Sequence, residues 1–165
     1  MEEQIRADVE RSGFHLGVIP PEAGTPGWAF TIGLGERFDH PELLAFAPDP
    51  EFLGRLVATL ARRVGRGDRF EAGRSYAEVL ADREVAMRAV ERTWYAPFLG
   101  NVAWHYGSED FDALQCYWPD GAGLFPWDED FDPKWRDDQP LLYLRETHLA
   151  LSERLTGVLR KEGAL

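Results

Sequence analysis

The sequence has one cysteine, no long apolar run and few basic residues. Cys116 stands alone among 165 residues, which excludes an internal disulfide and a zinc site built from several thiolates. No apolar run approaches the roughly 20 residues that a membrane-spanning helix needs. The first residues, MEEQIRADVERSG, are acidic and amphipathic and therefore unlike a secretory signal. We expect a cytoplasmic protein with no membrane partner.

The charge balance argues against nucleic acid as a partner. The formal net charge is -11, whereas nucleic-acid binding depends on cations that neutralise phosphates. The segment Ser108–Asp138 holds ten acidic residues against Lys134 and Arg136, and it is also rich in aromatic residues. This combination predicts either a surface for a basic protein partner or a solvated acidic loop whose rings fill the core.

Signatures of known chemistry are missing. There is no phosphate-binding loop or nucleophile elbow, and Phe38 stands where a dinucleotide loop needs its third glycine. The run 128–139 spaces three aspartates like a calcium loop, but Pro133 occupies the position that requires glycine. The four histidines lack the spacing of metal ligands. We therefore predict no metal and no cofactor.

Two short apolar segments joined by a polar turn form the centre of the sequence. Trp28, Phe30 and Ile32 alternate with smaller or polar residues, which predicts a half-buried strand. Residues 36–41 form the predicted turn, and Leu43–Ala47 is the second strand. His40 and Glu42 are then displayed together at one end of the strand pair.

The remaining periodicities predict an α+β fold. Apolar residues at helical spacing predict a helix over Asp49–Arg66, and one C-terminal helix is expected within residues 145–161. Further expected elements are strands over Phe14–Ile19, Glu84–Thr93 and Ala113–Trp118, a helical turn over Tyr76–Leu80, and a strand over Leu124–Trp127 that forms a hairpin with Ala113–Trp118. We predict a single domain over residues 1–165, with a mainly antiparallel sheet packed against helices.

Several motifs in a fixed order are similar to those of a known family. They are Trp28–Leu34 (WAFTIGL), His40–Leu44 (HPELL), Leu114–Asp120 (LQCYWPD), Gly123–Trp127 (GLFPW) and Gln139–Leu142 (QPLL). With these motifs the chain resembles the bacterial family called domain of unknown function 4262, over a core of residues 13–142. The resemblance implies a single bacterial domain and brings no activity, ligand or catalytic residue with it.

Three functional hypotheses follow from the residues. The first is a protein-binding or regulatory module whose acidic aromatic segment, Ser108–Asp138, meets a basic partner. The second is a small enzyme in which His40 acts as acid or base, Glu42 orients it and His105 completes the site. The third is a small-molecule binder with an apolar cage, for which the candidate ligand-binding residues are Trp28, Trp104, Gln115, Trp118 and Trp127. The C-terminal helix could also join two copies in a homodimer.

Overall fold

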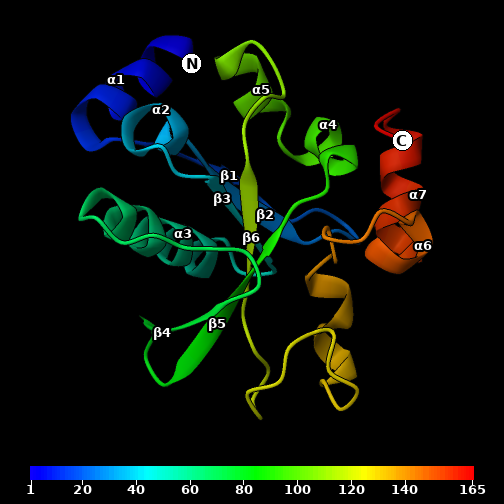
Figure 1. Ribbon diagram of the computed structural model, residues 1–165. Helices are drawn as coiled ribbons and strands as arrows, with labels where there is room; N and C mark the ends of the chain where they lie inside the picture. Colours follow the sequence, from blue (N-terminus) through cyan, green and yellow to red (C-terminus); the bar gives the residue numbers. More distant parts are fainter.

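The computed structural model describes residues 1–165 and is built around one six-stranded sheet (Figure 1). The strand order is β1-β2-β3-β6-β5-β4, and every pair of neighbours is antiparallel except β3 and β6. The strands are β1 (His15–Ile19), β2 (Gly27–Ile32), β3 (Glu42–Ala47), β4 (Ser75–Leu80), β5 (Arg83–Ala89) and β6 (Ala113–Tyr117). The sheet and its helices confirm the predicted α+β class.

One face of the sheet is covered by α3 (Pro50–Gly65) (Figure 1). The helix begins where the side chain of Asp49 accepts a hydrogen bond from the Glu51 amide at 3.0 Å, and Pro50 needs no such acceptor. Its apolar stripe packs mainly on β2 and β3, and the same cluster of buried residues extends to β5 and β6. The buried helix residues are Leu53, Leu56, Val57, Ala58, Leu60, Ala61 and Val64.

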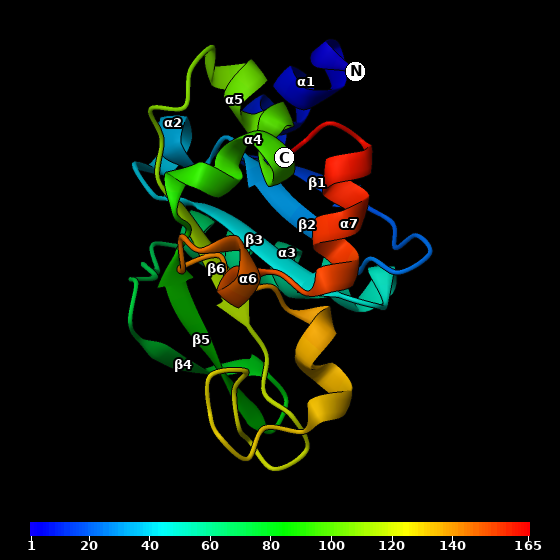
Figure 2. The ribbon, with the colours of Figure 1, turned by 90° about the vertical axis from the view of Figure 1, so that its right-hand side faces the viewer.

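The opposite face is covered by the other main helices (Figure 2). These are α1 (Glu2–Ser12), α4 (Tyr95–Phe98), α5 (Gly100–Tyr106), α6 (Thr147–Ala150) and α7 (Glu153–Lys161). Aromatic rings join this layer to the sheet: Phe98 stands edge-on to Phe46 of β3, with ring centroids 5.2 Å apart. The short helices α2 (Leu34–Phe38), η1 (Arg92–Trp94) and η2 (Pro133–Asp138) complete the chain.

The expected hairpin between Ala113–Trp118 and Leu124–Trp127 is wrong. Strand β6 lies between β3 and β5, so both of its edges are already paired. Residues 124–127 form no strand and lie in a run of turns and irregular chain, and Asp120 holds the start of this run by accepting hydrogen bonds from the amides of Ala122 and Leu124, each at 2.9 Å. The turn was predicted correctly, but its second arm has no strand with which to pair.

Three other local predictions differ from the structure. Residues 76–80 are part of β4, not a helical turn, because β4 pairs with the exposed edge of β5. The predicted turn over residues 36–41 overlaps the helix α2, whose C-cap is Asp39 with φ of 51°. The C-terminal segment holds two helices, α6 and α7, separated at Leu151 and Ser152. None of the helices combines the length and the apolar character needed to cross a lipid bilayer.

Candidate functional site

The carboxylate of Glu42 lies at the start of β3 and is almost completely buried, with 1% of its surface exposed. Three successive backbone amides converge on it: Gly33 at 3.2 Å, Leu34 at 3.1 Å and Gly35 at 3.1 Å. Gly33 has φ of 113°, and a Cβ there would lie 2.8 Å from a methyl of Val9. Only glycine therefore allows this close turn from β2 into α2.

Two hydroxyl groups complete the shell of Glu42. Thr31 donates to Oε1 at 2.8 Å, and the Tyr106 hydroxyl donates to Oε2. The Thr31 oxygen in turn accepts the amide of Leu43 at 2.9 Å. Burial raises the pKa of Glu42, and the hydrogen bonds from Tyr106, Gly35, Thr31 and Leu34 oppose that rise, while burial and the adjacent carboxylate raise the pKa of Tyr106. The donors that surround Glu42 join β2, α2, β3 and α5.

His40 is buried and has both ring nitrogens engaged. Its Nε2 accepts the amide N–H of Phe70 at 3.0 Å, so Nδ1 carries the proton and donates to the carbonyl of Pro41 at 2.7 Å. Burial lowers the pKa of His40, which keeps the ring neutral. The ring fastens the segment before β4 to the start of β3, and it has no nitrogen left for a substrate.

His105 lies on α5 and donates from Nε2 to Oε1 of Glu36 at 2.6 Å. Its ring stands edge-on to Tyr106, with centroids 5.1 Å apart. A cleft of about 630 Å³ is lined by His40, Glu42, Tyr106 and Glu36 but not by His105, which reaches it only through its hydrogen bond to Glu36. The buried members His40 and Glu42 hold the fold together, and their catalytic role remains a prediction.

The five candidate ligand-binding residues do not form one cage. Two tryptophans donate to carbonyl groups of the fold, Trp28 to Phe98 at 3.1 Å and Trp118 to Phe46 at 2.7 Å. Gln115 is buried and donates to the carbonyl of Pro140 at 2.9 Å. Trp104 is 59% exposed and borders a separate groove beside β1, whereas Trp127 borders a different cavity.

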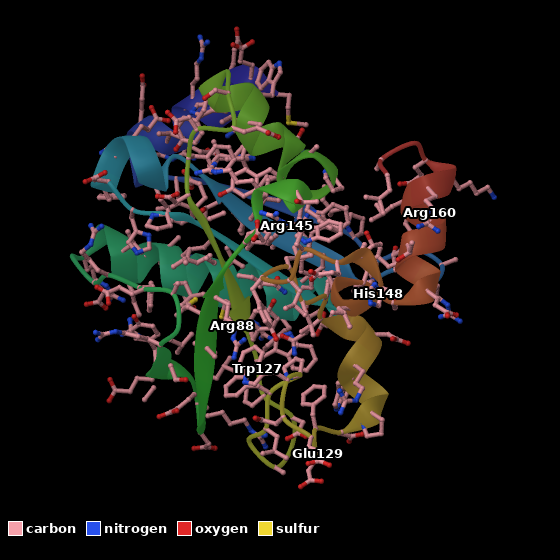
Figure 3. All side chains as sticks on the ribbon, turned by 45° about the vertical axis from the view of Figure 1, so that its right-hand side comes forward. Arg88, Trp127, Glu129, Arg145, His148 and Arg160 are labelled. Atoms are coloured by element: carbon pink, nitrogen blue, oxygen red, sulfur yellow. The ribbon has the colours of Figure 1, made fainter.

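The cavity beside Trp127 has a volume of about 730 Å³ and lies along β5 (Figure 3). Its central feature is the guanidinium of Arg88, whose carbon lies 3.7 Å from the ring centre of Trp127 and 4.2 Å from that of Tyr143. The two rings are nearly perpendicular, at 83°. A planar guanidinium can therefore lie flat against only one of them.

Arg88 projects from β5 on the face opposite α3. Its strand neighbours Val85 and Met87 alternate with it and belong to the buried cluster that contains the apolar face of α3. Phe125 stacks on Trp127 with centroids 5.2 Å apart and an angle of 12°. The segment after β6 therefore builds an aromatic wall that holds the guanidinium in place.

Sequence reasoning included Trp127 but missed Arg88 and Tyr143. An arginine at an alternating position of a strand gives no short-range signal, and its aromatic partners follow about 40 and 55 residues later. Elsewhere, no three His, Cys, Asp or Glu side chains are placed to hold one metal ion.

A family model described as "Domain of unknown function (DUF4262)" matches residues 8–132. The chain belongs to this family. The match confirms the resemblance carried by the sequence motifs, and it includes β1 to β6 together with Trp127. No curated protein and no solved structure matches this DUF4262 chain. The chemistry of the site therefore has to be argued from its own side chains.

Proposed function

We propose that this DUF4262 domain is a binding module for a small anionic ligand, which it takes up in the cavity around Arg88. One observation carries the proposal. Arg88 is the single partly buried arginine with neither an ion pair nor a hydrogen bond within the protein. The other arginines without such partners are all exposed: Arg55, Arg62, Arg66, Arg154 and Arg160.

The guanidinium of Arg88 has hydrogen-bonding capacity that the protein does not use. It carries five N–H donors in a fixed fork, and its nitrogens contact the solvent, because no buried side-chain nitrogen of the protein lacks a partner. The rings of Trp127 and Tyr143 contribute about 0.5–2 kcal/mol through cation–π attraction, but they accept no hydrogen bond along the fork. An anion in the cavity would supply both the acceptors and the missing charge.

The acidic aromatic segment favours a small ligand over a protein surface. None of its rings is among the exposed large apolar side chains of the protein, and Phe131 is fully buried. Trp135 packs edge-on against Trp118, with centroids 5.7 Å apart. These rings line the core and the cavity, so they do not present the exposed apolar patch that a docking surface needs. The basic protein partner and the homodimer through the C-terminal helix remain predictions.

The proposal can be tested by following arginine side-chain signals by NMR at low ionic strength. We expect the Nε–Hε resonance of Arg88 to shift saturably when sodium acetate or sodium phosphate is added. The exposed Arg55 on α3 is the internal control, and its resonance should move only with bulk ionic strength. Equal, non-saturating shifts at both arginines would refute the proposal, because Arg88 would then behave as an ordinary surface cation.

A further inference from the structure

The charges around the cavity define what kind of anion it would take, and this inference rests on the proposed function. Three arginines line the cavity, but two of them are already compensated. Arg74 pairs with Glu71 at 3.0 Å, and Arg92 lies 3.3 Å from Asp112 and donates to two backbone carbonyls. Arg88 is the only cation in the lining of the cavity that has no partner.

Two carboxylates also line the same cavity. Asp128 accepts the amide of Phe125 at 2.8 Å, and Glu91 lies 3.8 Å from Arg145 at its outer edge. With one unpaired cation and two carboxylates in its lining, the cavity can accept at most a single negative charge on the ligand. A phosphate dianion would bring a second charge that Arg88 could not neutralise and that Asp128 and Glu91 would repel.

The shape of the donor group points in the same direction. A guanidinium offers two parallel N–H groups, which match the two oxygens of a carboxylate in one plane. Because Trp127 and Tyr143 cross at 83°, they cannot cover both faces of Arg88, and no protein acceptor occupies its edge. A planar, bidentate head group fits this arrangement.

The cavity is also larger than a head group requires. Its volume of about 730 Å³ falls within the range of about 300–1,000 Å³ that is typical of sites for drug-sized ligands. Half of the residues that line it are apolar, and Phe125 and Trp127 form a stacked pair at its wall. We infer that the ligand is a monocarboxylate with an apolar or aromatic body, its carboxylate on Arg88 and its body against this wall.

Three probes that share a phenyl ring separate the head groups: phenylacetate, phenylacetamide and phenyl phosphate, each titrated at pH 7.5 by calorimetry and NMR. We expect phenylacetate to bind at least tenfold more tightly than phenyl phosphate and than acetate, and phenylacetamide not to bind. Arg88→Lys keeps the charge and loses the fork, so it should weaken phenylacetate binding at least tenfold. Arg55→Lys is the matched control and should leave binding unchanged.

The outcomes separate the two proposals. If phenyl phosphate binds as tightly as phenylacetate and both depend on Arg88, the domain binds anions but the carboxylate inference is wrong. If no probe binds and the Arg88 resonance does not respond, the proposed function itself fails. Binding that survives Arg88→Lys contradicts the bidentate fork. Trp127→Leu provides a second variant with the guanidinium intact, in which a loss of affinity for phenylacetate but not for acetate is expected, and equal effects would contradict the aromatic wall.

Discussion

Replacing Glu42 by Gln tests whether the buried carboxylate is the acceptor on which the β2-α2-β3 corner depends. The substitution keeps the shape of the side chain but exchanges one acceptor oxygen for an amide group with two donor hydrogens. All five groups that face Glu42 are donors. The amide must therefore oppose at least some of them, whichever way it is turned.

The expected loss of stability is worked out for the orientation of the substituted amide that breaks fewer hydrogen bonds. With the amide nitrogen at the Oε1 position, the Thr31 hydroxyl can rotate to accept, but the Leu34 amide loses its acceptor. An unsatisfied buried N–H costs about 1–3 kcal/mol, and the remaining hydrogen bonds lose the strengthening that a charged acceptor gives. We expect the free energy of unfolding to fall by about 2–4 kcal/mol, which corresponds to a drop in Tm of about 5–15 °C for a domain of this size.

Urea unfolding at pH 7, followed by circular dichroism, measures this change. Glu84→Gln is the matched control: Glu84 is exposed on β5 and has no partner, so its change should stay within about 0.5 kcal/mol. Tyr106→Phe removes a single donor and should cost less than Glu42→Gln. A change at Glu42 no larger than that at Glu84 would refute the reasoning, because the five donors would then not need the carboxylate.

Three further predictions concern pH, packing and reactivity. Burial lowers the pKa of His40, so below about pH 6.5 the unfolded chain binds a proton that the native ring does not. As the pH drops from 7 to 5, the free energy of unfolding of the wild type in urea should therefore fall relative to that of His40→Gln, by at most about 1.4 kcal/mol per pH unit. Parallel plots of unfolding free energy against pH for the two proteins would contradict this. Gly17→Ala places a Cβ 2.3 Å from the Phe30 ring and should cost about 1–3 kcal/mol, whereas Gly54→Ala in α3 has open space and should gain up to about 1 kcal/mol in the same unfolding assay. Burial raises the pKa of Cys116, so a thiol reagent should label it only along the urea transition, and rapid native labelling would contradict its burial.

The elements with strong periodicity could be predicted from the sequence. The helix over Asp49–Arg66 has a pattern that one buried face explains. The strands around Trp28 and Leu43 were also predicted, but β2 is buried on both faces and not half-buried as expected, because helices cover the sheet on both sides. The edge strand β4 was missed because its residues are mostly exposed and do not alternate, so only its pairing with β5 makes it a strand. Local strand propensity does not reveal a pairing that depends on the tertiary structure.

The candidate site was predicted in part, for a physical reason. His40 and Glu42 are neighbours in sequence, and a strand start displays them together wherever the rest of the chain lies. Only the contacts with Trp127 and Tyr143 distinguish Arg88 as a candidate site residue, and the chain brings these two rings to β5 after passing through β6. Contacts of such long range have no sequence spacing by which they could be recognised.

The motifs that identify the family lie mostly in the scaffold, and this explains why they carried no chemistry. Thr31, Gly33 and Leu34 of the first motif are three of the five donors around Glu42. The side chain of Gln139 likewise bonds both the amide and the carbonyl of Trp118, at 3.0 and 2.9 Å. Arg88 lies outside every one of these motifs and is the only partly buried cation that the fold leaves without a partner. A functional group is better sought among side chains whose hydrogen bonds the fold leaves unmade than among those that complete its corners.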